Sequence, residues 1–204
     1  MRALLSSVTL AIAAAALAPA PARAADFDAV ARGAERLDAL EPFLVRYVGH
    51  CVDVYERRTC EANVAATRRS ADGKTFAVRV QDAAPLVKPE VRGDGRFLLL
   101  LTPFVDGGGV ALTHGAPLRQ DAQGHPLVGL LPIQGTLPDG TMEMEFESPF
   151  RTGAIELEIV FRPEKPWKLK RKGEAGSYEG VAARFLAVRV LDARTGAPIA
   201  SKVF

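Results

Sequence analysis

An alternation of apolar and other residues, with a period of two, limits most strongly what this chain can fold into. It begins near residue 75 and is clearest in the runs 76–80, 141–147 and 155–161. A period of two is typical of β-strands that bury one face. Turns that contain glycine or proline separate these and other short apolar runs, and strands do not alternate with helices as they do in parallel sheets. The pattern predicts a mainly β domain of the α+β type, built as an antiparallel β-sandwich or a barrel-like structure.

Further strands are expected at 96–104, 110–113, 127–133, 167–172, 181–191 and 199–203. The first of these contains five consecutive apolar residues, which predicts a strand that is buried on both faces. In the run 141–147, Met142, Met144 and Phe146 are expected to point inward and the intervening glutamates outward.

The residues before 75 show a helical period instead. Apolar residues recur at steps of three or four from 26 to 41, and Pro42 is expected to end this first helix. A second helix is expected at 43–51 and a third at 60–69. The Asp72–Gly73 turn signal leaves open a hairpin over 60–80, but the alanine content of this segment favours the helix.

The N-terminal segment has the layout of a secretory signal peptide. Arg2 is followed by an apolar run over 3–17 and by small residues at Ala22 and Ala24. The apolar run is shorter than the roughly 20 residues that a transmembrane helix needs. We therefore expect a periplasmic or secreted protein that is cleaved after Ala24.

The mature chain, 25–204, is expected to form a single domain. Its parts are a helical subsegment over 25–70 and antiparallel sheets over 75–204.

The two cysteines, Cys51 and Cys60, are the only ones in the chain. Their C-x8-C spacing fits neither a zinc site, which needs four ligands, nor a C-x-x-C redox motif. Two lone thiols tend to pair in the oxidising compartments outside the cytoplasm. The spacing and the predicted export together favour a structural disulfide, with a free buried pair as the alternative. The disulfide would join the second and third helices.

The charges suggest which partners to expect. The predicted signal peptide contains two of the 26 basic residues and none of the 24 acidic ones, so the mature chain is balanced. A balanced chain argues against nucleic acid, whose binding proteins are strongly basic.

One basic cluster stands out, around Trp167, Lys168, Lys170 and Lys172. We interpret it either as a docking patch for an envelope protein or an acidic polymer, with Trp167 as an aromatic anchor, or as a lysine-protected edge strand.

Motifs for catalysis or cofactor binding are not apparent. The chain has no G-x-S-x-G elbow, no phosphate-binding glycine loop and no H-E-x-x-H. No catalytic residue, metal ligand or cofactor is therefore assigned.

Two further groupings of polar residues are present. One is a metal site made of Asp106, His114, Asp121 and His125. The other is an acidic stripe along two strands, in which paired carboxylates could hydrolyse glycosides; it consists of Glu143, Glu145, Glu147, Glu156 and Glu158. A solvated loop explains the first grouping equally well. A solvated strand face is the favoured explanation of the second, because glutamates that alternate with core residues face water.

Several segments resemble a family of uncharacterised exported bacterial proteins. They are the Cys51–Cys60 pair, LTPF at 101–104, ALTHGAP at 111–117 and DAQGHP at 121–126. The resemblance covers most of the mature chain and implies an exported single domain. It implies no particular chemistry.

Three classes of function follow. The first is a non-catalytic envelope module that binds a protein or a surface polymer. The second is a carrier that holds an apolar ligand or lipid between its sheets, drawing on Met142, Met144, Phe146, Ile155, Leu157 and Phe161. The third is a hydrolase with an unrecognised site.

Overall fold

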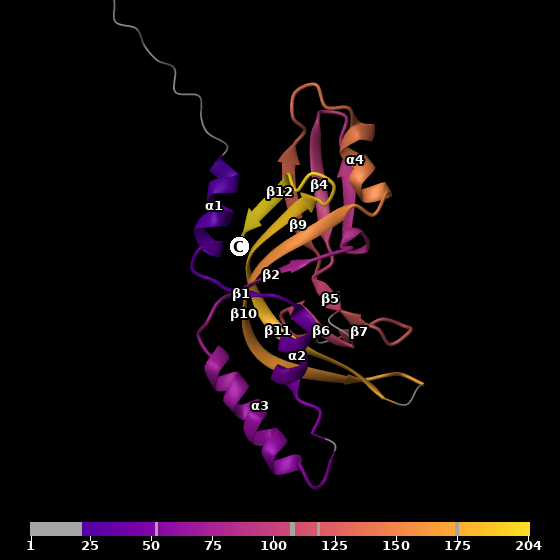
Figure 1. Cartoon of the computed structure of the whole chain (residues 1–204). Coiled ribbons are helices and arrows are strands. Elements are labelled where there is room, and N and C mark those ends of the chain that lie inside the picture. The colour runs from indigo at the N-terminus through magenta and orange to yellow at the C-terminus, as the bar shows by residue number, and fades with distance from the viewer. Residues whose placement is uncertain (1–21, 52, 107–108, 118, 174–175) are drawn as a thin grey trace, which may run out of the picture.

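A computed structural model describes residues 22–51, 53–106, 109–117, 119–173 and 176–204 (Figure 1). Most of the predicted signal peptide lies outside the described residues. Its last three positions, 22–24, belong to the first turn of a helix, α1 (Ala22–Ala31).

A long β-hairpin organises the fold. Its strands, β10 (Ile155–Lys170) and β11 (Ser177–Asp192), have 16 residues each and lie at the centre of a seven-stranded sheet. The strand order is β1 (Glu35–Leu37), β2 (Phe76–Val80), β10, β11, β6 (Val110–His114) and β5 (Phe104–Asp106), and β12 (Pro198–Val203) also pairs with β11.

The hairpin curves because its ladder is irregular at two places. Register shifts occur between Val160 and Phe161 and between Pro163 and Lys165, and β-bulges of this kind bend a strand. Strand β2 pairs with β10 only as far as Phe161. Among the described residues, the second half of β10 therefore has no strand partner on that side, and Pro163 and Pro166 are tolerated there although they lack a backbone N–H.

A smaller sheet and the remaining elements complete the structure. The smaller sheet consists of β3 (Val87–Val91), β4 (Arg96–Leu101) and β9 (Leu131–Thr136), and a two-stranded ladder of β7 (Arg119–Gln120) and β8 (Pro126–Leu127) lies apart from it. The other helices are α2 (Leu40–Val48), α3 (Arg57–Ala71), the 3₁₀ turn η1 (Ala84–Leu86) and α4 (Glu143–Arg151).

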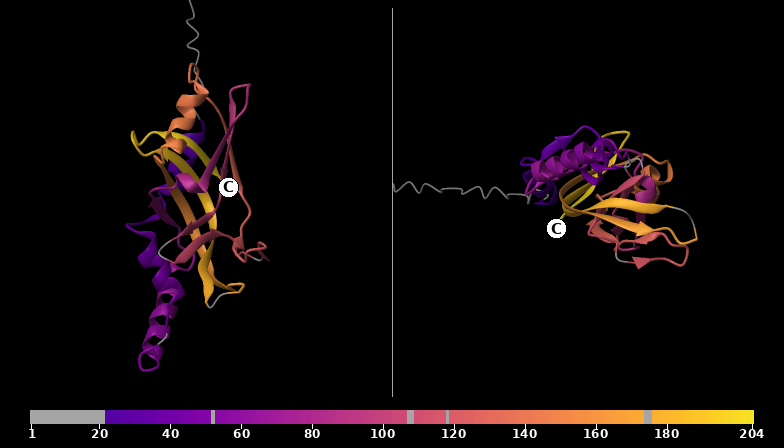
Figure 2. Two further views of the ribbon diagram at one scale, coloured as in Figure 1. Left: turned by 90° about the vertical axis from the view of Figure 1, so that its right-hand side faces the viewer. Right: turned by 90° about the horizontal axis from the view of Figure 1, so that it is seen from below.

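One face of the large sheet carries the main core. Ile159 and Val188 of the hairpin share this core with Leu99 and Ile133 of the smaller sheet and with Leu44 of α2. The smaller sheet thus covers one end of this face and α2 covers the other (Figure 2). We call this the inner face. Helix α1 lies on the opposite, outer face, where Phe27 packs against Val160 and Ala187.

The predicted fold class is confirmed. The protein is mainly β, with more than one sheet and an N-terminal helical segment that a disulfide staples. The described strands end at β1 and β5 without closing into a barrel. Most pairings are antiparallel, but β1 runs parallel to β2 and β6 runs parallel to β11.

The helix predicted at 26–41 is interrupted. Helix α1 ends at Ala31, and the chain then forms β1, where the backbone N–H of Glu35 donates to Thr75 O at 2.9 Å. Helix α2 begins at Leu40, two residues before Pro42. Proline is tolerated there because backbone N–H groups in the first turn of a helix have no intrahelical acceptor. The third predicted helix is confirmed as α3 and is longer than expected.

The prediction of a strand at 141–147 is wrong, because most of this segment belongs to the helix α4. The segment carries two patterns at once. Met142, Met144 and Phe146 alternate as in a strand, whereas Phe146 and Phe150 are four residues apart, as on one face of a helix. The rings of Phe146 and Phe97 lie 4.6 Å apart between centroids, so α4 packs on β4 by this helical face. The carboxylate of Glu145 accepts the Met142 N–H at 3.3 Å, and carboxylates in the first turn stabilise a helix.

The strand predicted at 96–104 is divided into β4 and β5. In β4, Phe97, Leu99 and Leu101 are buried, whereas Leu98 and Leu100 are only half-buried. The strand therefore buries one face fully rather than both.

Candidate docking surface

The disulfide predicted between Cys51 and Cys60 is present. Their Cα atoms lie 5.5 Å apart, a usual separation for a disulfide. The bond joins the residues after α2 to the first turn of α3. We refer to α2, the connecting loop and α3, residues 40–71, as the α2–α3 arm.

The base of the arm is fixed by two further contacts. The guanidinium of Arg68 donates to Tyr47 O at 2.9 Å and to Val48 O at 3.0 Å, which satisfies carbonyls at the end of α2 that lack helical partners. Gly49 follows with a φ of 76° and lies against Val64, whose side chain a Cβ at this position would overlap. Only glycine accommodates both the positive φ and this close approach.

Helix α2 itself is held by the sheet. Its Phe43 ring lies 4.9 Å from the Phe76 ring and 6.0 Å from the Phe161 ring. The hydroxyl of Tyr47 donates to Glu164 O at 3.0 Å. The arm therefore starts from a rigid attachment to the inner face.

Helix α3, in contrast, is largely uncovered. Of its 15 residues only Ala71, the last, is buried. The helix extends past the end of the hairpin in two perpendicular views (Figures 1 and 2). A helix in this position gains little stability from burial, because most helical stability in proteins comes from packing an apolar face.

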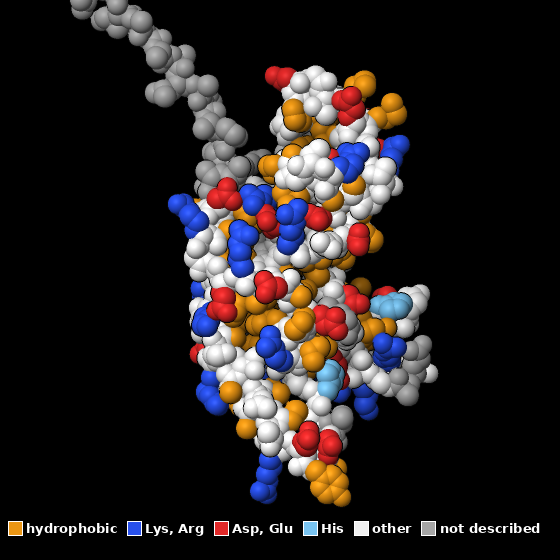
Figure 3. All heavy atoms as spheres, viewed as in Figure 1, with side chains coloured by type: hydrophobic (Ala, Val, Ile, Leu, Met, Phe, Trp, Pro, Cys, Tyr) orange, Lys and Arg blue, Asp and Glu red, His pale blue; other side chains and the backbone are white. Residues whose placement is uncertain are grey.

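The loop of the arm exposes apolar side chains. Val54 is 74 % exposed and Tyr55 is 99 % exposed, and the disulfide closes the loop that holds both. Hydrophobic side chains are visible among charged ones at this end of the molecule (Figure 3). Next to the loop, an open groove of about 670 Å³ lies between the helices, lined by residues that include Val45, Cys60 and Val64.

The arm contains five arginines and four acidic residues, and its positive charge is concentrated on α3. Helix α3 contains four arginines and one glutamate. Arg68 is used at the base of the arm. For Arg57, Arg58 and Arg69, the described part of the chain provides no hydrogen-bond or ion-pair partner.

The basic cluster predicted from the sequence is placed elsewhere, at the tip of the hairpin, and part of it is already engaged. Trp167 is buried, and its indole N–H donates to Thr113 Oγ1 at 3.0 Å. Lys168 pairs with Glu179, and Lys172 donates to Asp121 O at 3.0 Å. Lys168, Lys170 and Lys172 are all exposed, but the Trp167 ring is not available as a surface anchor.

The residues of the candidate metal site do not converge. His125 pairs with Asp121 at 3.1 Å, whereas His114 accepts the backbone N–H of Phe185 at 3.1 Å. Within the described ranges, no group of three potential ligands could hold a metal ion.

The acidic stripe is not formed either. Glu143, Glu145 and Glu147 lie on α4, whereas Glu156 and Glu158 lie on β10. The two on β10 pair with Arg79 and Arg189. The prediction of one acidic stripe along two strands is therefore wrong, and the glutamates form two separate groups.

His114 occupies an unusual position in the large sheet. Strands β6 and β12 lie end to end along β11, with partners at 179–183 and 187–191. The backbone N–H of Phe185 falls between them, and His114 Nδ1 accepts it in place of a strand carbonyl. The imidazole must be unprotonated at Nδ1 to accept. Burial lowers the pKa of His114 below its ordinary value; the nearby Arg184 lowers it further and Glu164 opposes the shift.

We expect this histidine to make stability depend on pH. Since its folded-state pKa lies below about 6.5, the unfolded chain binds more protons between the two pKa values, and the free energy of unfolding falls as the pH drops below about 6.5. The variant His114→Asn keeps an acceptor near Nδ1 but does not titrate. Denaturant unfolding between pH 5 and 8 should give a flatter profile for the variant, and parallel profiles would contradict the assignment.

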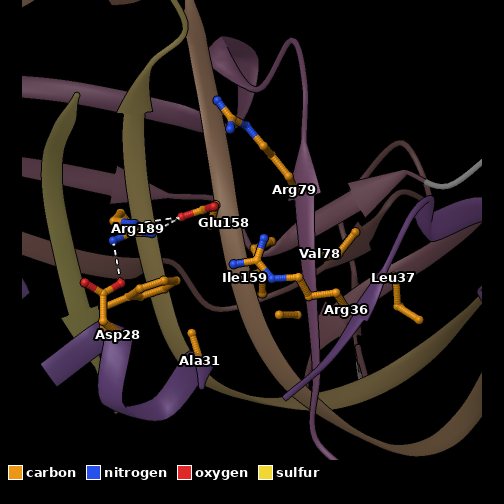
Figure 4. Close-up of a pocket in the computed structure, with 11 residues that line it drawn as sticks. Asp28, Ala31, Arg36, Leu37, Val78, Arg79, Glu158, Ile159 and Arg189 are labelled. Carbon is orange, nitrogen blue, oxygen red and sulfur yellow. Dashed lines mark hydrogen bonds and ion pairs between the residues drawn. The ribbon is translucent and has the colours of Figure 1, made fainter. Parts of the chain in front are cut away.

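A second hollow, of about 130 Å³, lies beside α1 and is polar (Figure 4). Arg189 donates to Glu158 Oε2 at 2.7 Å and to Asp28 Oδ1 at 2.8 Å. Its guanidinium also lies 4.2 Å from the centroid of the Phe27 ring. This network fastens α1 to the outer face.

None of the described helices is both long and apolar enough to cross a membrane. Comparison with curated proteins and with solved structures gives no match. The model of a family of unknown function, DUF6066, matches residues 1–202. The match spans nearly the whole sequence, and the chain therefore belongs to the DUF6066 family.

Proposed function

We propose that the protein is an exported, non-catalytic module that binds an acidic protein partner through the α2–α3 arm. Export is supported by the signal-peptide layout of the first 24 residues and by the disulfide, which persists in oxidising compartments. A binding role is supported by the arm, which places apolar and basic side chains away from the core.

The observation that carries the proposal is the stapled, exposed loop. Tyr55 is 99 % exposed in a loop that the Cys51–Cys60 bond closes. A closed loop loses less conformational freedom on binding than an open one. Tyrosine and arginine, with tryptophan, are enriched at the energetic centres of protein interfaces, and here Arg57 and Arg58 follow Tyr55 closely.

The charge of α3 favours an acidic partner. Three of its arginines have no partner in the described structure, and complementary charge accelerates association and discriminates between partners. The lysines at the hairpin tip could extend such a contact, but Lys168 and Lys172 already have partners. The arm is therefore the better candidate.

The carrier hypothesis finds less support. Met142, just before α4, and Met144, on α4, are 58 % and 67 % exposed and do not lie between the sheets. Ile155, Leu157 and Phe161 are fully buried and pack in the shared core.

Site-specific photo-crosslinking in intact cells tests the proposal. A photoreactive amino acid at position 55 should crosslink to one acidic protein, and the same group at Leu127, 48 % exposed on β8, should not. Adding Arg57→Gln and Arg58→Gln to the position-55 probe should abolish the product, since the charge would be lost while the probe stays in place. Equal products from both positions, or a product that survives the loss of both arginines, would exclude the arm as the docking surface.

A further inference from the structure

At two positions of the β10–β11 hairpin, charged residues that face each other across the strands have opposite signs. Glu158 lies opposite Arg189, and Lys168 lies opposite Glu179. Both are opposite-charge pairs, and both form ion pairs; Figure 4 shows the first of them. Opposite charges at directly facing positions of antiparallel strands stabilise a sheet.

At a third position, the two facing residues have the same charge. Arg162 lies directly opposite Arg184, and like charges at facing positions are destabilising. Both side chains are exposed, and the described residues offer neither of them a hydrogen bond or an ion pair. The two β-bulges flank Arg162, one on each side.

Both arginines lie on the outer face. Their neighbours Phe161 and Phe185 belong to the main core on the inner face, and successive side chains of a strand point to opposite faces. Lys165 comes next on the outer face, because it pairs with Ala182 and Ala182 packs beside Trp167. Three cationic side chains therefore follow one another on the outer face, between the residues that contact α1 and the group of Trp167, Ala111 and Ala182.

We propose that Arg162, Arg184 and Lys165 form a binding site for a phosphate group. Facing Cβ atoms in an antiparallel pair are about 4.5–5.5 Å apart, so two guanidinium groups can reach the same anion. A phosphate has three acceptor oxygens and about two negative charges, and arginine matches this geometry with paired N–H donors. A single carboxylate would leave most of the charge of the three cations unneutralised. A bound phosphate would accept hydrogen bonds from both Arg162 and Arg184, and its negative charge would offset the repulsion between them.

Two effects of the double variant Arg162→Gln/Arg184→Gln follow from this geometry. Without phosphate and at low ionic strength, its melting temperature should equal or exceed that of the wild type, since a repulsive contact is removed. In calorimetric titration with inorganic phosphate, its dissociation constant should be at least tenfold weaker than that of the wild type, at ionic strength matched with chloride. The control Lys88→Gln/Arg92→Gln removes two charges on and just after β3 of the smaller sheet and should bind phosphate as the wild type does.

A sedimentation experiment with vesicles distinguishes the sources of the phosphate. If the wild type, but not the double variant, sediments with phosphatidylcholine vesicles that contain phosphatidic acid, the site takes a lipid headgroup. Binding of inorganic phosphate without sedimentation assigns it to a soluble phosphorylated ligand. The site is refuted if wild type, double variant and control bind phosphate equally, or if the wild type binds neither probe. The test concerns the outer face of the sheet, so either result leaves the α2–α3 arm untouched.

Discussion

Replacing Phe161 by alanine is expected to lower the free energy of unfolding by about 3–5 kcal/mol, the range for deletion of a buried phenylalanine ring. Phe161 is fully buried. Its ring lies 6.0 Å from those of both Phe43 and Phe76, so it connects α2 to the large sheet. The surrounding ladder of β10 limits how far the site can collapse around the cavity.

Thermal and denaturant unfolding measure this effect. For a mature chain of this length, the loss corresponds to a decrease in melting temperature of roughly 6–20 °C. Tyr55→Ala provides the control, because a residue that is 99 % exposed should change stability by no more than about 0.5 kcal/mol. Similar losses from the two substitutions would show that Phe161 is not at the centre of the core.

The second large effect is expected for the disulfide. The double variant Cys51→Ser/Cys60→Ser should lose about 2.5–3 kcal/mol, because the bond closes a loop of about ten residues and restricts the unfolded chain. Helix α3 should be affected first, since only one of its residues is buried.

Reduction of the wild type provides a matched control. Dithiothreitol should move the unfolding midpoint of the wild type to that of the double variant and leave the variant unchanged. Hydrogen exchange of α3 amides should accelerate in both. If oxidised and reduced proteins unfold at the same midpoint, the disulfide does not staple the arm.

The sequence predicted those elements in which one period was unambiguous. The run at 155–159 alternates cleanly and is a strand with Ile155 and Leu157 fully buried. In 141–147 two periods coincided, and the helical one prevailed because the Phe146 ring packs against Phe97. The local pattern could not reveal this, because the partner ring lies in a distant segment of the chain.

The candidate sites divide in the same way. The disulfide could be predicted because it depends on the number of cysteines and on their compartment. Trp167 could not be placed correctly, because its burial depends on Thr113 and Gly180 from other strands. The pairing of Arg162 with Arg184 depends on two bulges that fix the register, and no spacing in the sequence reveals bulges. The exposed loop could have been predicted from the sequence, because Val54 and Tyr55 lie between the two cysteines.

The central claim is that the α2–α3 arm binds an acidic protein. The most direct test uses the partner that photo-crosslinking identifies, purified in its free form. Calorimetry at low and high salt measures its affinity for the wild type and for the triple variant Tyr55→Ala/Arg57→Gln/Arg58→Gln. We predict an affinity at least 30-fold weaker for the variant, equivalent to about 2 kcal/mol, with an unchanged melting temperature and a smaller salt dependence. The control Lys88→Gln/Arg92→Gln should bind as the wild type does. Equal affinities of the triple variant and the wild type would contradict the claim.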